Sequence, residues 1–480
     1  MKSIWRDNLV IDRREPLNGD IQCQVAVVGG GLAGILTAYF LHKQGKEVVV
    51  LEAKTIGSEQ TENTTAKITA QHNLIYHSLI QDFGIEKAKQ YAEANKKAIS
   101  EYRRIIEEEQ INCHFEERSA YLYSTQGSEQ LEQEANAAEK LGIVSSLTTE
   151  TNLPFPVKCA LKFSNQAQFH PLEFLKAITN SLTIYEHTEA KEIEDNRIIT
   201  ERGIVTAEHI VIATHYPYIN VPGYYFMRMH QERSYVLALK NAKQVEGMYL
   251  SIDQEGYSFR NIGDVLIFGG GQHRTGDNPS GDKYEKLRTA AKEFFPDSIE
   301  IGHWSAQDCM TLDSVPYIGQ FSSSTPNCYV ATGFGKWGMT NSMISAMIIC
   351  DLILKRDNSF SDVFSPQRFR FSASAQTLIE DGIQAVKGLM SELFVLPEEE
   401  ISQLPNGHGG IVDYKGQKVG VFKNMQGKAF FVSTRCTHLG CQLEWNPDEL
   451  SWDCPCHGSR FDYKGNLINN PAMKNLSNNY

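Results

Sequence analysis

The stretch QVAVVGGGLAG, residues 24–34, decides the fold of most of this chain. Its first five residues predict a buried strand, the G-x-G-x-x-G that follows predicts a tight turn, and a helical segment continues to about Gln44. A second apolar run, EVVVLE at 47–52, predicts another strand that ends in an acid. Strand, glycine turn, helix and strand together form the unit that binds a dinucleotide in doubly wound sheets.

Three spaced glycines and the acid each have a physical role in such a unit. Gly29 permits the turn, Gly31 lets backbone N–H groups approach a pyrophosphate, and Gly34 lets the helix pack closely on the strand. The helix N-terminus then faces the phosphates, whose negative charge its dipole stabilises. Glu52, eighteen residues after Gly34, is placed to bind a ribose hydroxyl. An ordinary glycine-rich turn would leave this acid unexplained, so the sequence predicts a dinucleotide site.

Segments further along resemble the D-amino acid oxidase family of FAD-dependent flavoproteins, over about residues 24–355. The loop GSEQTENTTAKITAQH at 57–72 resembles the loop that runs along the pyrophosphate and flavin in that family. DSVPYIG at 313–319 and ATGFGKWGMT at 331–340 resemble its closing motif, where glycine backbone and a helix N-terminus cradle the ribityl chain. His170-Pro171 before an expected helix, and an expected strand at 208–213, fit the same pattern.

The resemblance implies FAD as the cofactor, bound by segments at about 20–75, 165–218 and 306–360. The residues expected to contact FAD come from the glycine turn, the Thr-rich loop and the closing motif: Gly29, Gly31, Gly34, Glu52, Thr65, Ala66, Lys67, Gly319, Gly333, Gly335, Gly338, Met339 and Thr340. Lys336 and Trp337, within the closing motif, are the expected catalytic residues, because their side chains can reach the isoalloxazine or a bound carboxylate.

Two blocks, at about 76–164 and 219–305, interrupt the nucleotide-binding pattern. The first begins with a charged segment, 85–110, whose less polar residues recur at three and four, as in an amphipathic helix. The second contains alternating runs at 234–239, 256–260 and 264–269, which predict antiparallel strands. In the resembling family such strands wall off a substrate pocket. Candidate substrate residues, each with an ordinary surface or packing role as the alternative, are Arg228, Arg233, Tyr235, Arg260, His273, Arg274 and Trp304.

Two Cys/His pairs lie near the C-terminal end, in CTHLGC at 436–441 and CPCHGS at 454–459. Two short loops can therefore each offer one thiolate and one imidazole to an inorganic centre, and a Cys2His2 zinc site is one alternative. The loops resemble those of Rieske proteins from respiratory and photosynthetic cytochrome complexes, where two cysteines bind one iron and two histidines the other. The resemblance implies a [2Fe-2S] cluster and a disulfide, with ligands Cys436, His438, Cys454 and His457 and disulfide partners Cys441 and Cys456.

Two residues beside these loops bear on the reduction potential of the cluster. Ser459 occupies the position whose hydroxyl bonds a bridging sulfide in high-potential relatives. Phe461 stands where those relatives have a tyrosine that bonds a ligating cysteine sulfur, and phenylalanine cannot donate that bond. Hydrogen bonds to the sulfurs stabilise the reduced cluster. We therefore expect a reduction potential below that of the cytochrome-complex type.

The expected architecture is an α/β FAD-binding Rossmann-like domain with an α+β substrate-binding domain, followed by a small all-β Rieske sandwich. Residues 1–375 form the oxidoreductase, with an irregular N-terminal arm at 1–23, and 396–480 form the Rieske domain. Runs at 418–422 and 429–432 predict short strands in the latter. An apolar stripe predicts a connector helix at 376–395, with members Ile379, Ile383, Val386, Met390 and Leu393.

Composition argues against several classes of partner. The 480 residues carry a net charge of −12, so nucleic acid and anionic membranes, which need a basic patch, are not expected partners. Arg13-Arg14 precedes an apolar run at 25–41, but acidic residues intervene and the run is shorter than the roughly twenty residues that span a bilayer. We expect neither a signal peptide nor a transmembrane segment. Six scattered cysteines favour a cytoplasmic protein: Cys23, Cys113, Cys159, Cys309, Cys328 and Cys350.

The expected reaction is oxidation of a small amine, amino acid or related donor by hydride transfer to FAD. Electrons would then leave singly through the cluster to a one-electron acceptor, a protein or a quinone, that docks near His438 and His457. Reduction by NAD(P)H would need a second dinucleotide motif, and FGGG at 268–271 lacks the helix and acid. Two alternatives stay open: a redox sensor or electron-transfer module without turnover, and a Rieske non-haem oxygenase with iron on His72 and His77. Against the oxygenase, Thr69 stands where a nearby acid is expected.

Overall fold

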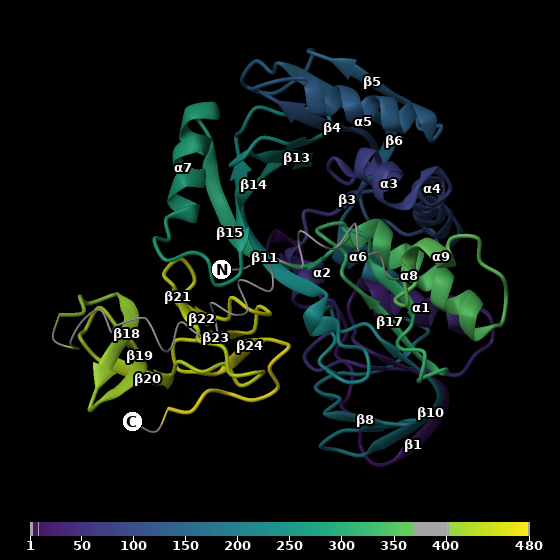
Figure 1. The fold of residues 1–480 in the computed structure, drawn as a ribbon. Helices are drawn as coiled ribbons and strands as arrows, with labels where there is room; N and C mark the ends of the chain where they lie inside the picture. Colours follow the sequence, from purple (N-terminus) through teal and green to yellow (C-terminus); the bar gives the residue numbers. More distant parts are fainter. Residues whose placement is uncertain (1–2, 8, 369–400, 402, 479–480) are drawn as a thin grey trace.

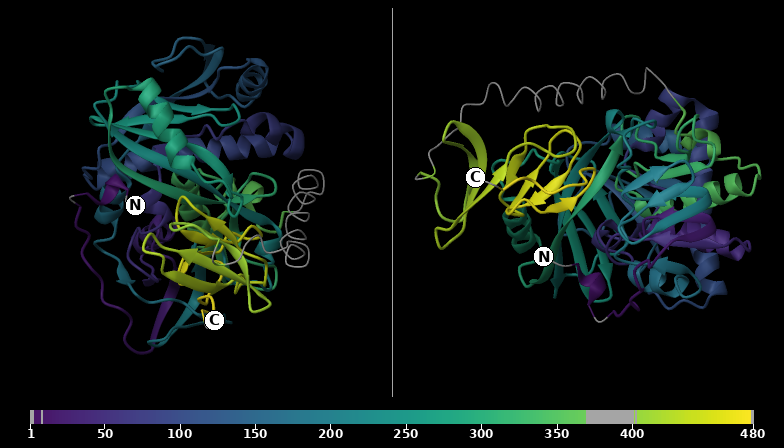
Figure 2. Two further views of the ribbon diagram at one scale, coloured as in Figure 1. Left: turned by 90° about the vertical axis from the view of Figure 1, so that its left-hand side faces the viewer. Right: turned by 90° about the horizontal axis from the view of Figure 1, so that it is seen from below.

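The computed structural model describes residues 3–7, 9–368, 401 and 403–478. A parallel sheet and a larger antiparallel sheet make up the first three quarters of the chain, and a strand-rich C-terminal domain packs beside the antiparallel sheet (Figure 1). In the view from below, this domain lies at one end of the molecule, far from the helices that cover the parallel sheet (Figure 2).

The parallel sheet is built around the predicted strand, turn, helix and strand. Strand β1 (Ile21–Val28) pairs in parallel with β2 (Val48–Leu51), and helix α1 (Leu32–Lys43) connects them. The sheet continues as β16-β17-β10-β1-β2-β7, and its other strands are β7 (Thr183–Tyr185), β8 (Glu192–Glu194), β9 (Arg197–Ile199), β10 (Ile204–Ile212), β16 (Tyr317–Gln320) and β17 (Cys328–Thr332). All four residues of β2 are buried, as expected for a parallel strand covered on both faces. The predicted Rossmann-like unit is confirmed.

Helices cover the parallel sheet and bring the closing motif to it. Helix α8 (Gly338–Ile353) packs against α1 and α4 (Ile85–Glu108), so the closing motif begins a buried helix, and α4 confirms the predicted amphipathic helix. Helix α6 (Pro171–Ile178) starts where predicted, and its N-cap His170 accepts the Glu173 N–H. The other helices are η1 (Ile4–Arg6), α2 (Gln60–Asn63), α3 (Ile75–Phe83), α5 (Glu129–Lys140), η2 (Tyr225–Met227), α7 (Lys283–Phe294) and α9 (Ser361–Phe364).

The antiparallel sheet runs in the order β15-β11-β14-β13-β12-β4-β6-β3, with β5 paired to β6. Its strands are β3 (Lys67–Ile68), β4 (Glu116–Ser124), β5 (Ser145–Thr148), β6 (Cys159–Gln168), β11 (Met229–Lys240), β12 (Met248–Ser251), β13 (Ser258–Ile262), β14 (Val265–Arg274) and β15 (Ile299–Thr311). The three predicted strands of the second block are confirmed as β11, β13 and β14. The sheet extends beyond the expected blocks, because β3, the end of β6 and the end of β15 belong to it.

The C-terminal domain is all β, as predicted. It contains a sheet of β18 (Gly409–Tyr414), β19 (Gln417–Lys423) and β20 (Ala429–Ser433), and a second sheet of β21 (Glu444–Asn446), β22 (Ser451–Asp453), β23 (Arg460–Asp462) and β24 (Leu467–Asn469). Its core buries Trp452, Phe461 and Val432 together with four cysteines of the cluster loops. The short loops between these strands therefore hold the cysteines in packed surroundings.

Two expectations about the ends of the oxidoreductase have different outcomes. The N-terminal arm is mostly irregular up to β1, as predicted, but it is tightly packed. Trp5 is fully buried and its Nε1 donates to the Thr64 carbonyl oxygen at 2.8 Å, and Leu17 is buried as well. The polar composition of 1–23 concealed these apolar anchors. The expected connector helix at 376–395 lies outside the described residues.

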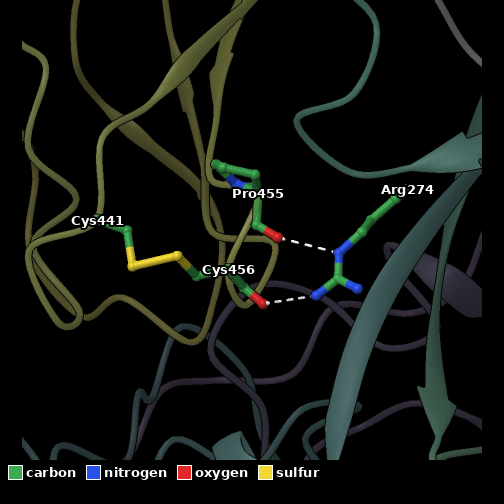
Figure 3. Close-up of a disulfide and its surroundings, with 4 residues drawn as sticks. All are labelled: Arg274, Cys441, Pro455 and Cys456. Atoms are coloured by element: carbon green, nitrogen blue, oxygen red, sulfur yellow. Dashed lines mark hydrogen bonds between the residues drawn. A yellow bond between two sulfur atoms is a disulfide. The ribbon is translucent and has the colours of Figure 1, made fainter. Parts of the chain in front are cut away.

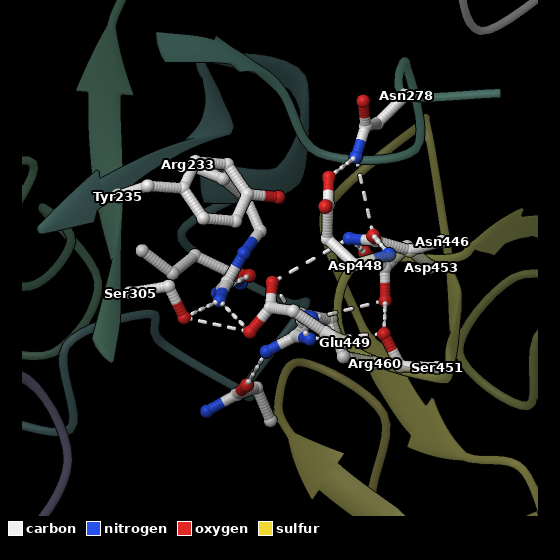
Figure 4. Close-up of polar contacts among 12 residues, drawn as sticks. Arg233, Tyr235, Asn278, Ser305, Asn446, Asp448, Glu449, Ser451, Asp453 and Arg460 are labelled. Atoms are coloured by element: carbon white, nitrogen blue, oxygen red, sulfur yellow. Dashed lines mark hydrogen bonds and ion pairs between the residues drawn. The ribbon is translucent and has the colours of Figure 1, made fainter. Parts of the chain in front are cut away.

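A buried ionic network attaches the C-terminal domain to the antiparallel sheet (Figure 4). Arg233 Nη2 lies 2.5 Å from Glu449 Oε1, and Arg460 Nη2 lies 3.2 Å from Glu449 Oε2. Arg460 Nε also bonds Asp453 Oδ1 at 2.9 Å. The side chains of all four residues are at most 6% exposed. Charges buried this deeply are stable only when each has its partner, so the network fixes how the two domains meet.

Close backbone approaches accompany this network. A Cβ on Gly276 would lie 2.6 Å from the Pro455 nitrogen, and one on Gly458 would lie 2.6 Å from the Gln231 Cβ. Asn278 Nδ2 donates to Asp448 Oδ2 at 2.9 Å. Glycines are needed at such positions because any side chain would push the two surfaces apart. The loops of the C-terminal domain and the antiparallel sheet are therefore in direct contact at these two glycines.

We expect Arg233→Met to weaken this attachment, because it leaves Glu449 buried with Arg460 as its remaining cation. The free energy of unfolding should fall by on the order of 3 kcal/mol, measured by urea titration with tryptophan fluorescence. Arg288→Met is the matched control, since Arg288 is one-third exposed where it bonds Glu285 and Glu300. It should cost less than about 1 kcal/mol. Equal losses in the two variants would contradict the role given to Arg233.

Candidate functional site

A cavity of about 1150 Å³ runs from the N-terminus of α1 to the N-terminus of α8 and to the adjoining wall of β11 and β15. This exceeds the roughly 300–1000 Å³ typical of sites for drug-sized ligands, so it suits an extended ligand such as a dinucleotide. The predicted FAD residues that line it are Gly29, Gly31, Glu52, Thr65, Lys67, Gly335, Gly338 and Met339. Lys336 and Trp337 line it as well. Gly34, Ala66, Gly319, Gly333 and Thr340 are not among its lining residues.

The glycine turn at one end of the cavity is shaped as a phosphate site requires. Gly29 has φ +116°, and a Cβ there would lie 2.4 Å from the Ala213 carbonyl oxygen. A Cβ on Gly34 would lie 2.0 Å from the Gly29 carbonyl oxygen, so helix and turn touch. Because these glycines have no side chains, the backbone of the turn is accessible from the cavity, as binding of a pyrophosphate requires. Gly34 does not line the cavity, but its lack of a side chain lets helix α1 pack against the turn.

Glu52 has a structural task in addition to the ribose contact predicted for it. Its Oε2 accepts the Gly30 N–H at 2.7 Å, and its Oε1 accepts the Lys54 N–H at 2.7 Å. Burial raises the pKa of this carboxyl, and the two backbone N–H bonds act in the opposite direction. The acid therefore braces the glycine turn while it lines the cavity.

The Thr-rich loop is held against the antiparallel sheet by two buried cations. Arg260 Nη1 donates to the carbonyl oxygens of Thr65 and Ala66, at 2.8 and 2.7 Å. Lys67 Nζ donates to Ser258 Oγ at 3.0 Å. Burial, aided by the charge of Arg260, lowers the pKa of Lys67 to about 7. Arg260 thus fixes the backbone of the loop, and a substrate role for it stays a prediction.

The closing motif brings Lys336 and Trp337 into the cavity by different means. Lys336 has φ +73°, and its Nζ lies 2.6 Å from Glu232 Oε2. Trp337 stacks on His72, with ring centroids 4.7 Å apart and an interplanar angle of 14°. His72 Nδ1 bonds the Tyr91 hydroxyl at 2.6 Å. The ammonium group of Lys336 therefore lies at the cavity wall, and the indole ring of Trp337 lines the cavity in an orientation fixed by its stacking on His72.

His72 is not arranged as a ligand for a mononuclear iron. Its Nε2 bonds the Thr69 carbonyl oxygen at 2.7 Å, so both ring nitrogens have partners within the protein. Burial lowers the pKa of His72 to about 3, which keeps the ring neutral. This geometry gives no support to an iron site on His72 and His77.

Most of the other substrate candidates lie away from the cavity, and only Tyr235 lines it. Arg228 bonds the carbonyl oxygens of Gly223 and Pro366, and Trp304 Nε1 donates to the Asn63 carbonyl oxygen. His273 bonds Tyr235 and the Arg274 carbonyl oxygen. Arg233 and Arg274 contact the C-terminal domain. These arginines make the structural contacts that were the alternative to substrate binding, and a substrate role for them stays a prediction. Residue type in a strand does not reveal which face of the sheet a side chain occupies.

The two cluster loops bring their cysteines and histidines together. Cys436 and Cys454 are buried, and the rings of His438 and His457 lie 4.9 Å apart at an interplanar angle of 89°. The interaction between the two thiols lowers the pKa of Cys436 and raises that of Cys454, because the two groups share one proton when they lie this close. Cys454 also lies within 4.8 Å of the disulfide sulfurs of Cys441 and Cys456.

His438 is oriented as a metal-ligating histidine would be. Its Nδ1 is buried without a hydrogen-bond partner, while its Nε2 lies 3.0 Å from Asn220 Oδ1. Burial lowers the pKa of His438 to about 4, so the ring is neutral. A neutral imidazole with one nitrogen held by a neighbouring oxygen is the usual state of a metal ligand. The donor set of two thiols and two imidazoles fits a [2Fe-2S] cluster of the Rieske kind.

A disulfide joins Cys441 and Cys456, linking the two cluster loops as the resemblance implied. Figure 3 shows Arg274 of β14 reaching the loop that carries this disulfide. Its Nε donates to the Pro455 carbonyl oxygen at 3.1 Å and its Nη2 to that of Cys456 at 3.4 Å. Arg274 therefore ties the second cluster loop to the oxidoreductase.

Ser459 and Phe461 lie beside the cluster cysteines, fully buried. The Ser459 hydroxyl oxygen accepts the Ala472 N–H at 3.0 Å, and the hydroxyl acts to lower the pKa of the Cys436 thiol. Phe461 offers no polar hydrogen in this position. The lower reduction potential that follows from Phe461 stays a prediction.

Opposite faces of strand β11 serve the two sites. The residues Glu232 and Ser234 line the cavity, whereas Gln231 and Arg233 point to the C-terminal domain. This alternation is the two-residue period of a strand. Gln231 Nε2 donates to the His457 carbonyl oxygen at 2.7 Å. A single strand layer thus separates the cavity from the cluster loops.

Further contacts at this boundary had no signal in the sequence. Gln307 Nε2 donates to Gln231 Oε1 at 2.6 Å and to the Gly458 carbonyl oxygen at 2.8 Å. The ring of Phe226 packs edge-on against His457, with centroids 5.8 Å apart. The C-terminal domain also supplies part of the cavity wall, through Leu467, Ile468, Asn470, Ala472, Met473, Lys474 and Asn475. The cavity is therefore shared between the two domains.

Comparisons with known proteins agree with this architecture. Residues 24–352 match the family described as DAO, FAD dependent oxidoreductase, and residues 394–479 match the Rieske [2Fe-2S] domain. YhfW of Bacillus subtilis (strain 168), whose name describes a Rieske 2Fe-2S iron-sulfur protein, is 38% identical over 99% of this chain and 97% of its own length. A cytochrome b6-f complex iron-sulfur subunit of Nostoc (strain PCC 7120) is 47% identical, over 9% of this chain and 25% of its own.

Solved structures share the fold of the oxidoreductase. Glycine oxidase from Geobacillus kaustophilus aligns with a TM-score of 0.63 and 19% identity, over 73% of this chain and 99% of its own. L-proline dehydrogenase from P. horikoshii aligns with a TM-score of 0.62 and 20% identity, over 74% and 98%. No helix among the described residues is long and apolar enough to cross a membrane. The chain belongs to the FAD dependent oxidoreductase family of D-amino acid oxidase type and carries a C-terminal Rieske [2Fe-2S] domain.

Proposed function

We propose that this protein oxidises a small amine, amino acid or related donor at FAD and passes the electrons one at a time through its Rieske cluster to an acceptor. The observation that carries the proposal is the position of β11. One face of this strand lines the cavity and the other contacts the cluster loops. A flavin can accept two electrons at once, whereas the cluster carries one, so the pair would convert a two-electron oxidation into single-electron steps.

FAD, when bound, supplies the hydride acceptor, and the chain supplies binding and orientation. Gly29, Gly31 and the N-terminus of α1 would hold the pyrophosphate, and Glu52 fixes the turn that presents them. Lys67 and the stacked ring of Trp337 line the cavity and restrict where a donor can lie. Lys336, fixed by Glu232, presents a charge to the bound donor. Positioning of this kind can supply much of the rate enhancement of a bimolecular reaction.

Gln231 and Gln307 support a direct route between the two centres. Both are nearly inaccessible to solvent, at 2% and 1% exposed, and together they bond the carbonyl oxygens of His457 and Gly458. Each is rooted in a strand whose adjacent residue lines the cavity: Glu232 follows Gln231 and Asp308 follows Gln307. Electrons would cross one layer of covalent and hydrogen-bonded backbone.

The acceptor would approach from the side of His438. We expected docking near both histidines, but His457 is only 8% exposed where it packs beneath Phe226 and Gln231. Leu439, next to His438, is 43% exposed. Of the two predicted histidine ligands, His438 is therefore the more accessible to an acceptor that would take electrons from the cluster.

Cys436→Ala tests the relay. With a reducing donor, stopped-flow mixing should still bleach the flavin, but the reduced-cluster EPR signal should disappear. Steady reduction of cytochrome c, which is too large to enter the cavity, should fall by about a hundredfold or more, because the route through the cluster is lost. Cys328→Ala, a change in β17 outside both sites, should leave all three readings unchanged. Unaltered cytochrome c reduction in Cys436→Ala would rule out an obligatory relay, and an absence of bleaching by any donor would favour a redox module without turnover.

Phe461→Tyr tests the tuning of the cluster. The wild-type midpoint should lie below the top of the Rieske range of roughly −150 to +300 mV, and the added hydroxyl should raise it by on the order of tens of millivolts. Redox titration followed by EPR measures both values. Phe430→Tyr makes the same chemical change on β20, where its ring contacts Phe422 and Tyr463, and it should not shift the midpoint. A wild-type midpoint at the top of the range would refute this view of Phe461.

A further inference from the structure

The wall of the cavity formed by β11 and β15 carries two carboxylates directly opposite each other. Glu232 on β11 is the register partner of Asp308 on β15, and both line the cavity. Like charges opposite each other on neighbouring strands destabilise a sheet. Because the pair of carboxylates destabilises the sheet, its position in the wall of a ligand cavity suggests that the two groups act on a bound ligand.

The two carboxylates differ in what surrounds them. Glu232 is ion-paired with Lys336, whose Nζ lies 2.6 Å from Oε2, and the His230 imidazole lies 3.6 Å from its other oxygen. Lys336 also donates to Gln272 Oε1 at 2.9 Å. The carboxylate of Asp308 makes no hydrogen bond or ion pair within the part of the chain that the structure describes. Burial and the charge of Glu232 raise its pKa to about 6, against the opposing charges of Lys336 and Arg233. At neutral pH this wall thus presents one unmatched negative charge to a ligand.

The cations that line the cavity are lysines, and three of them, Lys54, Lys191 and Lys336, are ion-paired with glutamates. None of its lining residues is an arginine. The guanidinium of Arg260 lies behind the Thr-rich loop on the carbonyl oxygens of Thr65 and Ala66, and that of Arg233 is on the far face of β11 with Glu449. Two parallel N–H bonds from an arginine are the usual way to fix a carboxylate. This part of the cavity has no such clamp.

We propose that the donor carries a second, positively charged group and that Asp308 binds this group, so that diamine-like donors are preferred over amino acids held by their carboxylate. This inference rests on the function proposed above and specifies its substrate class. With FAD bound, the reacting carbon would lose its hydrogen as hydride to the flavin, while the lone pair of the adjacent neutral amine would form the C=N bond of an iminium ion. The second ammonium keeps its protons and stays on Asp308. Asp308 is a specificity-determining residue, and the Glu232–Lys336 pair leaves its charge unneutralised.

Three donors of similar length separate the charge requirement from chain length: butane-1,4-diamine, 1-aminobutane and 4-aminobutanoate. Anaerobic flavin bleaching of the holoenzyme should half-saturate at a concentration at least about tenfold lower for the diamine than for the other two, as expected for a charge-assisted contact. Asp308→Asn should remove the advantage of the diamine and change 1-aminobutane by less than about threefold. Asp264→Asn, at an 81%-exposed carboxylate of the same sheet, should change none of the three. Preference for 4-aminobutanoate would overturn the inference.

A binding measurement keeps this inference separable from the oxidation itself. Tetramethylammonium and acetate are each titrated into the oxidised holoenzyme, and binding is followed through the flavin absorption spectrum. Tetramethylammonium should bind at least about tenfold more tightly than acetate, and Asp308→Asn should abolish the difference. Tighter binding of acetate, or an unchanged difference in the variant, would refute the role of Asp308. Selective binding of the cation with no bleaching by any donor would instead refute the proposed oxidation and leave the charge preference standing.

Discussion

Strand β11 is the element on which both sites depend, because its two faces are committed to different chemistry. Glu232 faces the flavin cavity, while Gln231 and Arg233 face the Rieske domain. The alternation of a strand imposes this division, since neighbouring residues must point to opposite sides. A shift of one residue in register would exchange the two sets and bury Arg233 in the cavity wall. The long pairing of β11 with β14 and β15 fixes the register against such a shift.

The docking of the Rieske domain follows from the same strand. The Arg233–Glu449 pair is buried and therefore costly to separate, and Arg460 and Asp453 complete its charge balance. Gly458 can approach Gln231 because it has no side chain. These contacts bury His457 and leave His438 nearer to solvent. Both histidines contact the oxidoreductase, His457 through Phe226 and His438 through Asn220 and Phe226, and they differ in how far solvent reaches them.

Local patterns were enough to predict the parallel sheet and both cofactors. The glycine turn at 29–34 and the two cluster loops are short motifs whose function is set by spacing, so they can be read from the chain alone. The antiparallel strands were also predictable from alternation. What could not be read was pairing across long distances: nothing local tells that Glu232 meets Asp308, or that Gln307 reaches Gly458. The polar N-terminal arm concealed a buried Trp5 for the same reason.

Arg233 and Arg274 share a structural role. An arginine in a strand of a flavoprotein sheet suggests a carboxylate ligand, and Arg233 does bind a carboxylate. The carboxylate it binds belongs to Glu449 of the second domain, and Arg274 likewise binds carbonyl oxygens of a cluster loop. Both cations therefore hold the two domains together. No arginine lines the cavity, whereas Asp308 does, so the attachment of the Rieske domain and the charges of the cavity wall both depend on the same sheet.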